Sequence, residues 1–126
     1  MKTLKLLIIL TVLILVYGHT SAQKEPIKVA GGHKVEIKTS AVCSMCKEAI
    51  EYDLAFEKGV KSAVLDVPSK VVTVVYNPKK TDADKIRKRI TKVGYHADSL
   101  QRDSVAYEKL PFCCKDDAHE GEHEPH

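Results

Sequence analysis

The stretch KVEIKTSAVCSMCKEAIEYDLA, residues 34–55, joins an alternating segment to a helical one. Val35 and Ile37 alternate with charged side chains, and a period of two with one apolar face predicts a half-buried strand over 34–42. The segment that follows carries apolar residues on one side of a helix: Ala49, Ile50 and Leu54. Cys43 therefore falls in the strand-to-helix loop, and Cys46 falls in the first turn of the helix. Ser44 is the expected helix cap.

The next elements follow from similar patterns. Gly59 is expected to end the first helix. Two β-branched runs, at 60–67 and 70–76, flank a Pro-Ser turn and predict a hairpin. Ile86 and Ile90 stand at helical spacing in a second helix, which opens at Thr81 or Asp82 and ends at Gly94.

The remaining segments complete the architecture. Residues 95–101, YHADSLQ, are expected to form a short last strand, and residues 23–33 a loose lead-in containing Pro26 and two glycines. The order β-α-β-β-α-β at this size predicts an α+β, ferredoxin-like sandwich, in which a four-stranded antiparallel sheet carries two helices on one face. We expect this single domain to span residues 34–103.

Residues 1–22 have the pattern of a secretory signal peptide. Lys2 and Lys5 precede an apolar run over 6–17, which is shorter than the roughly 20 residues that span a bilayer. Small residues up to Ala22 offer a cleavage point, with an uncleaved anchor as the alternative. The mature chain is therefore expected to be exported and soluble, and periplasmic if the source is Gram-negative.

Charge is unevenly distributed. Residues 23–107 hold 16 Lys and Arg against 11 Asp and Glu, whereas residues 108–126 hold 2 against 6. The one dense basic stretch, residues 79–92, has no interleaved aromatic side chains to stack on bases. We therefore expect a solvated helix face there and no nucleic-acid partner.

The Cys43-x-x-Cys46 pair is by itself consistent with a disulfide, a redox centre, half of a zinc site or a site for a soft metal ion. Thiolates select Cu(I), Hg(II), Cd(II) or Zn(II), and zinc normally needs four ligands. The helix N-terminus near Cys46 favours the thiolate. A thioredoxin-type oxidoreductase generally has Trp before its pair, and this chain has no Trp. A thiol-disulfide redox protein remains the alternative of another class.

Several features together resemble the heavy-metal-associated domain family over residues 34–100. They are the cysteine pair, Gly59-Val60, a Val-rich hairpin ending in VVYNP, and the segment DADKIRKRITKVGYHA. The family includes copper chaperones, metal-binding modules of copper-pumping ATPases and an exported mercury scavenger. The resemblance implies a non-enzymatic protein that binds Cu(I) at Cys43 and Cys46, with Hg(II) next and Zn(II) or Cd(II) as further candidates. A metal-transporting membrane protein or another metal-binding domain is the implied partner.

The resemblance also implies roles near the pair. The family usually has Gly-Met-x before the first cysteine, and its Met packs under the metal loop; Ala41 stands there in this chain and is expected to support the loop less firmly. Tyr95 occupies the position of a residue that tunes the site, and it matches the aromatic that bacterial members place there. His96 could add a third ligand, although an exposed histidine at a strand start is the favoured interpretation.

The C-terminal stretch LPFCCKDDAHEGEHEPH, residues 110–126, combines two adjacent cysteines with histidines and carboxylates. It lacks apolar periodicity, so residues 104–126 are expected to form a flexible tail without a ligand. Cys plus clustered His is a metal-binding composition. We therefore expect a second, weaker metal site that feeds or shields the first, with a solvated tail as the alternative: Cys113, Cys114, His119, His123 and His126.

Overall fold

The computed structural model describes residues 1–5, 8 and 23–119. Most of the expected signal peptide lies outside these residues, as do His123 and His126. Among the described residues, no helix is both long enough and apolar enough to cross a membrane.

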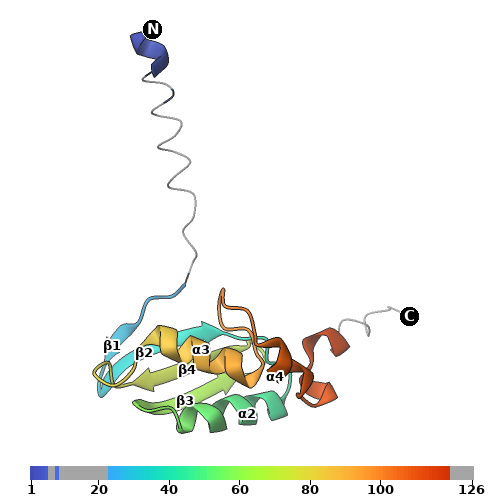
Figure 1. Cartoon of the computed structure of the whole chain (residues 1–126). Coiled ribbons are helices and arrows are strands. Elements are labelled where there is room, and N and C mark those ends of the chain that lie inside the picture. Colours follow the sequence, from blue (N-terminus) through green and yellow to red (C-terminus); the bar gives the residue numbers. More distant parts are fainter. Residues whose placement is uncertain (6–7, 9–22, 120–126) are drawn as a thin grey trace.

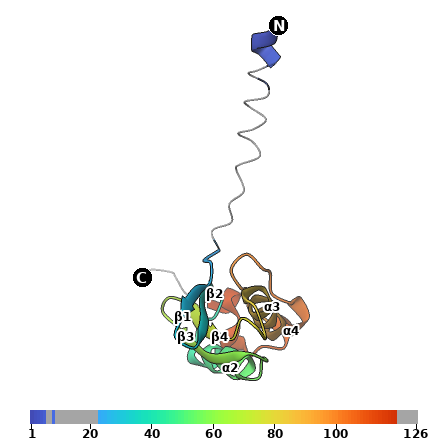
Figure 2. The ribbon, with the colours of Figure 1, turned by 90° about the vertical axis from the view of Figure 1, so that its left-hand side faces the viewer.

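Four antiparallel strands form one sheet in the order β1-β2-β4-β3 (Figure 1). The strands are β1 Ile27–Val29, β2 Gly32–Lys38, β3 Val60–Asp66 and β4 Val71–Tyr76. Two long helices, α2 (Ser44–Ala55) and α3 (Ala83–Val93), pack on this sheet, and Figure 2 shows the strands to one side of α3. The predicted ferredoxin-like sandwich is confirmed.

One core lies between the sheet and the helices. Val72, Val74 and Tyr76 of β4 are buried, and the residues between them are more exposed. The helices bury residues at helical spacing against them: Cys46, Ile50, Leu54, Ala83, Ile86 and Ile90. Full burial of one such aliphatic side chain contributes roughly 1.5–3 kcal/mol. This packing fixes the position of α2 and thereby of Cys46 in its first turn.

The helix ends agree with the sequence for α3 and differ for α2. The Asp82 side chain accepts a hydrogen bond from the Lys85 N–H at 2.9 Å, and α3 ends at Gly94 with a left-handed φ of 111°. In α2, Cys43 is the N-cap and Ser44 is the first helical residue. This helix ends at Ala55, before Gly59 is reached, because the chain turns through residues 56–59 before entering β3.

The fourth strand comes from a different segment than expected. Residues 95–101 make only isolated bridges, between Thr39 and Ala97 and between Ala97 and Leu100. The lead-in instead supplies β1, which pairs with the first half of β2 through a tight turn at Ala30-Gly31. Gly31 and Gly32 have φ of 89° and 148°, and a Cβ on Gly32 would lie 2.2 Å from the Tyr76 carbonyl oxygen. The two glycines, which suggested a loose segment, therefore make the hairpin.

Asp98, which follows α3, explains why the expected last strand stays short. Asp98 has a φ of 51°, so the chain turns directly after the bridge that Ala97 makes with Thr39. Its Oδ1 accepts the Lys38 N–H at 2.9 Å, and its own N–H donates to the Lys38 carbonyl at 2.8 Å. Arg87, a buried side chain of α3, donates to Asp98 Oδ2 at 2.8 Å. The Asp98 side chain therefore accepts the Lys38 N–H that a backbone carbonyl would accept if this strand were longer.

The expected flexible tail is folded over its described part. It forms α4 (Ser104–Glu108), followed by the 3-10 helices η1 (Phe112–Cys114) and η2 (Asp116–His119). α4 contacts α3, and η1 contacts α2 at the end where that helix begins (Figure 1). Tyr107 and Cys114 are buried. The prediction of disorder was wrong for residues 104–119, because these side chains pack on the domain without a periodic pattern.

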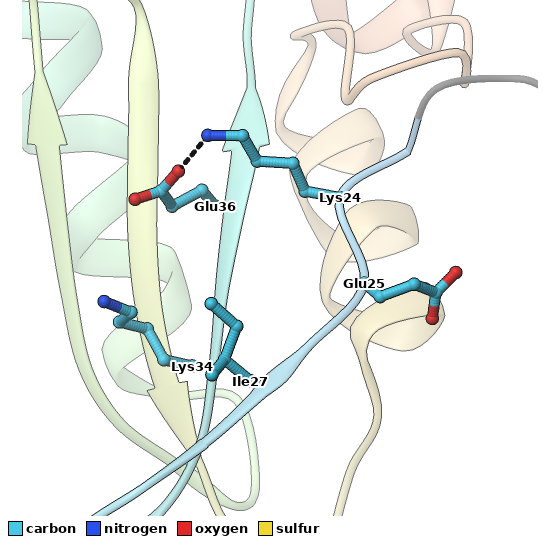
Figure 3. A pocket seen from close by; sticks show the side chains of 5 residues that line it. All are labelled: Lys24, Glu25, Ile27, Lys34 and Glu36. Atoms are coloured by element: carbon cyan, nitrogen blue, oxygen red, sulfur yellow. Dashed lines mark hydrogen bonds and ion pairs between the residues drawn. The ribbon is translucent and has the colours of Figure 1, made fainter.

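A pocket lies at the β1–β2 edge of the sheet, lined by the five residues labelled in Figure 3. Lys24 and Glu36 form an ion pair across it, and the hydrogen bond and charge of Lys24 hold the pKa of Glu36 below its usual range. β1 pairs with the first residues of β2, whereas the cysteine loop follows the other end of that strand. This pocket contains no sulfur donor and is separate from the cysteines.

Candidate metal centre

Cys43 and Cys46 converge at the start of α2. Cys43 is the extended N-cap, and its carbonyl accepts the Lys47 N–H at 3.2 Å. Its thiol makes no capping hydrogen bond to the helix, which leaves the sulfur directed to other partners. Cys46 is completely buried, and the two Sγ atoms lie 3.1 Å apart. The pair thus has one partly exposed and one buried thiol.

The loop before the pair is held by side-chain hydrogen bonds. The Ala41 N–H donates to Thr39 Oγ1 at 3.2 Å, and that hydroxyl donates to the Lys70 carbonyl at 2.9 Å. Ser40 Oγ accepts the His96 N–H at 3.0 Å. Ala41 itself lies in the core. These bonds connect the loop to the β3–β4 turn and to the segment after α3, and they hold the loop although Ala41 fills its core position with a small side chain.

The C-terminal segment brings Cys113 and Cys114 to the same place. The Sγ atoms of Cys43 and Cys114 are 3.7 Å apart, and the sulfurs of Cys43, Cys113 and Cys114 all lie within 4.8 Å of one another. All four cysteines of the chain are thiols. The sequence suggested a separate tail site, whereas the structure places the tail cysteines beside the first pair. The four cysteines are called the thiol cluster below.

Met45 adds a fifth sulfur that the sequence analysis did not single out. Its Sδ lies 3.4 Å from Cys113 Sγ, and its side chain is about half exposed. The sequence placed Met45 in the first turn of the helix, but only the fold of the C-terminal segment brings Cys113 to it. Met45 is therefore a candidate accessory donor at the outer side of the thiol cluster.

Tyr95 lies beneath the thiol cluster. Only 1% of its surface is exposed, and its hydroxyl has no hydrogen-bond partner among the described residues. Burial raises the pKa of Tyr95, and the neighbouring thiols of Cys46 and Cys114 raise it further. Tyr95 therefore stays neutral beside two of the sulfurs.

Burial also raises the pKa of the Cys114 thiol. The neighbouring Cys46 and Cys43 act in the same direction, while the Tyr95 hydroxyl acts in the opposite one. Cys114 is thus a neutral thiol in the metal-free protein, and a bound cation would favour its thiolate, as metal binding generally displaces thiol protons.

The structure does not place the predicted histidine ligands that it describes, His96 and His119, with the cysteines. His96 Nδ1 accepts the Arg102 N–H at 3.2 Å, so its ring holds the 96–102 loop. The group of metal-ligand atoms found among the described residues contains cysteines and does not contain His96. The backbone of His119 belongs to η2. The structure therefore gathers the cysteines and does not show the histidines joining them.

A set of polar contacts holds the segment that carries Cys113 and Cys114. The Arg102 guanidinium lies 3.5 Å from the centre of the Tyr107 ring and 2.5 Å from Asp116 Oδ1. The Tyr107 hydroxyl lies 3.1 Å from the same oxygen and donates to Asp117. Burial and these two carboxylates raise the pKa of Tyr107 to about 12. These four residues are called the tail clamp, and they fix the chain on both sides of η1.

The donor set decides which ions fit. Four thiols and one thioether are soft ligands, which favour Cu(I), Hg(II), Cd(II) and Zn(II) over hard cations such as Mg²⁺ or Ca²⁺. The sulfurs of Cys43, Cys113 and Cys114 lie within 4.8 Å of one another, and Cys46 lies next to Cys43. The arrangement is a site for a soft metal ion.

Comparison with known proteins agrees with this geometry. The family model described as "Heavy-metal-associated domain" matches residues 35–96. A copper-exporting P-type ATPase of Staphylococcus aureus (strain JH9) is 39% identical over 59 residues, a match that covers 47% of this chain and 7% of the ATPase. The chain therefore corresponds to a small part of the curated relatives that it matches.

One solved structure with a TM-score above 0.5 shows the same fold, and a second is also similar. The copper-binding domain from HMA7, a P-type ATPase, is 22% identical, with a TM-score of 0.51 over 56% of this chain and 96% of that chain. The N-terminal domain of a potential copper-translocating P-type ATPase from Bacillus subtilis, in the Cu(I)-loaded state, is 30% identical, with a TM-score of 0.49 over 52% of this chain and 82% of that chain. The family match ends at residue 96, so Cys113 and Cys114 lie beyond it.

Proposed function

We propose that this protein, whose residues 35–96 match the heavy-metal-associated domain family, is an exported carrier of Cu(I). Cys43 and Cys46 capture the ion, and a second metal-binding protein receives it. The observation that carries the proposal is the convergence of the two thiols at the start of α2, one buried and one partly exposed.

The choice of Cu(I) rests on coordination chemistry and on the relatives. Two thiolates can satisfy Cu(I) or Hg(II) in near-linear coordination, whereas zinc sites in proteins are almost always four-coordinate. The relative from Staphylococcus aureus is named for copper export, and a copper-binding domain shares the fold. Hg(II) is the alternative cargo, because it has the same preference for two thiolates.

Transfer to a partner follows from exposure. Cys43 is partly exposed, so a partner's thiolate can approach the ion from the Cys43 side while Cys46 still holds it. Ligand exchange of this kind needs no dissociation of the ion into water. A metal-binding domain of a copper-transporting membrane protein is the proposed acceptor, and the similarity to part of a copper-exporting ATPase supports it.

Export rests on the pattern of residues 1–22. A short basic start, an apolar run and small residues up to Ala22 are typical of a cleaved signal. Mass spectrometry of the protein recovered outside the cytoplasm should find a chain that begins at Gln23. Recovery of the intact N-terminus in the membrane fraction would instead establish an anchor.

Cu(I) competition against a chelator, under anaerobic conditions, tests the site assignment. In a chain limited to residues 23–107, which lacks Cys113 and Cys114, the protein with both cysteines should remove Cu(I) from the chelator, and the double variant Cys43→Ser/Cys46→Ser should not. Ser44→Ala is the matched control, because it changes the exposed residue between the ligands without removing a sulfur. Equal competition by the protein with both cysteines and the double variant would refute the assignment. A parallel titration with Hg(II) distinguishes the two cargoes.

A further inference from the structure

We propose that Cys114 is a third thiolate ligand to the ion held by Cys43 and Cys46, so that the chain's own C-terminal segment closes the site. This inference rests on the proposed function and adds a ligand that lies outside the residues matched by the family. The chemistry is a three-sulfur site for Cu(I), in place of an open two-sulfur site.

The Cys43–Cys114 separation suits a shared ion, whereas Cys43 and Cys46 lie closer together than two ligands of one ion. With metal–sulfur bonds of about 2.3 Å, two thiolates are about 4.0 Å apart in a trigonal site and about 4.6 Å apart in a linear one. The Cys43–Cys114 separation is 3.7 Å, close to the trigonal value, and Cys43–Cys46 is 3.1 Å. Cys43 is thus the sulfur common to both pairs. A modest opening of the Cys43–Cys46 pair would admit an ion that Cys114 already reaches.

Cys114 is also held in place before any ion arrives. Its side chain is only 2% exposed, and its N–H donates to the Pro111 carbonyl at 2.9 Å within η1. The tail clamp anchors the chain on both sides of this turn. A thiolate on a fixed segment of the same chain acts at an effective concentration of roughly millimolar or above. No second molecule is therefore needed to complete the site.

The buried Tyr95 hydroxyl is an independent observation that points to the same place. It has no hydrogen-bond partner among the described residues, although buried hydroxyls usually have one. The thiols of Cys46 and Cys114 are the groups that act on it. The buried hydroxyl therefore lies against two of the three sulfurs that we propose as ligands.

Closure by Cys114 affects how the ion is released, and Cys113 stays outside the proposed set of ligands. Cys113 is less buried and lies beside Met45 at the outer side of the thiol cluster. Release of the ion to a partner then requires that Cys114 of η1 gives up its bond to the ion, a step that an open site of two sulfurs would not need. The closed site favours retention of Cu(I) over rapid exchange.

The test compares Cys114→Ser with Cys113→Ser in the full chain, since the two residues are adjacent and differ in burial. The probe is Cu(I) itself, measured by chelator competition and by X-ray absorption, which counts sulfur neighbours. Cys114→Ser should lower the affinity by roughly tenfold to a hundredfold and reduce the sulfur count from three to two. Cys113→Ser should keep three sulfurs and stay within about threefold of wild type.

Each outcome decides the inference. Two sulfurs in wild type, or an unchanged affinity in Cys114→Ser, would overturn it, and so would a larger loss in Cys113→Ser. Circular dichroism and thermal unfolding of the metal-free variants check the fold, and Cys114→Ala repeats the test with a side chain suited to a buried position. If Cys43→Ser/Cys46→Ser loses Cu(I) but Cys114→Ser does not, the proposed function stands and only the third ligand fails.

Discussion

The loop at Cys43 and Cys46 and the segment that carries Cys113 and Cys114 supply the same chemistry by different physical means. The loop is positioned by an aliphatic core, because Cys46 occupies the same buried face of α2 as Ile50 and Leu54. The C-terminal segment is positioned by an aromatic ring, a guanidinium and carboxylates. The first pair should therefore persist whenever the domain is folded, whereas the second depends on a few polar contacts that can open locally.

The largest expected effect is a loss of stability in the aliphatic core that positions the first pair of cysteines. Ile50→Ala removes a fully buried side chain next to Cys46 in the core and should lower the free energy of unfolding by about 2–5 kcal/mol. Urea denaturation followed by circular dichroism measures the change. Phe56→Ala, at an exposed position just beyond the end of the same helix, is the control and should change stability by less than about 1 kcal/mol. Similar losses for both variants would contradict the assigned core.

Removal of the C-terminal segment sharpens the comparison. A chain that ends at Leu110 should still fold and bind one Cu(I), because both ligands of the first pair remain, but with roughly tenfold or greater loss of affinity. A chain that ends at His119 keeps η1 and η2 and is the control. Chelator competition and metal content per chain provide the measurements. Loss of a whole ion in the shorter chain would instead support a separate tail site. Loss of Zn(II) or Cu(II) binding in the control would assign a role to His123 and His126.

The sequence predicted the parts of the molecule that repeat with the period of a strand or helix. Val35 and Ile37 identified β2, and the spacing of Ile86 and Ile90 identified α3, since each period places side chains on one buried face. The same patterns placed Cys43 in the loop between a strand and a helix and Cys46 in the first turn of that helix. Family resemblance added the expectation that this loop binds metal.

The parts that the sequence did not predict depend on contacts between distant residues. β1 pairs with β2 through a turn in which Gly31 has a φ of 89°, and Gly32 at the start of β2 approaches the carbonyl of Tyr76 on β4 so closely that a Cβ would not fit. The thiol cluster joins Cys43 to Cys114 across 71 positions, through a clamp that follows no period. Composition alone made residues 104–119 resemble a flexible tail, and only the packing of Tyr107 and Cys114 shows that they are folded.

A smaller effect is expected from the tail clamp. Tyr107→Phe keeps the ring under Arg102 but removes the hydroxyl contacts with Asp116 and Asp117. The local stability of residues 104–116 should fall by about 1 kcal/mol. Amide hydrogen exchange measures this change, and Tyr52→Phe at an exposed position is the matched control. Equal protection of this segment in both variants would show that the hydroxyl does not hold it.

The same hydroxyl gives a pH dependence. The pKa of Tyr107 is about 12 in the folded chain, above the ordinary value of 10.0. Its contribution to stability is therefore fully present below pH 10 and is lost as the pH rises through about 12. Wild type should lose protection of residues 104–116 over this range, and the part of that loss due to Tyr107 should be absent in Tyr107→Phe.

The smallest effect concerns an ion pair beside the first pair of cysteines. Glu51 of α2 accepts the backbone N–H of Leu65 at 2.8 Å and pairs with Lys47, so it links the helix to β3. Burial alone would raise the pKa of Glu51, but the hydrogen bonds from Lys47 and Leu65 outweigh it and hold the pKa below 4.5. A carboxyl whose pKa is lowered by folding stabilises the fold at any pH above its pKa in the unfolded chain. It loses that contribution as the pH falls through its pKa in the folded chain.

Glu51→Gln should therefore destabilise the metal-free chain at neutral pH. The expected loss is only about 0.5–1 kcal/mol, because the ion pair is partly exposed and solvent screens the charge. The difference from wild type should shrink as the pH falls below 4.5 and Glu51 becomes neutral. Glu48→Gln, at an exposed position of the same helix, is the control. Urea unfolding at several pH values measures both variants. A difference that stays constant across this range would mean that the charge of Glu51 contributes little and that the substituted amide perturbs the packing instead.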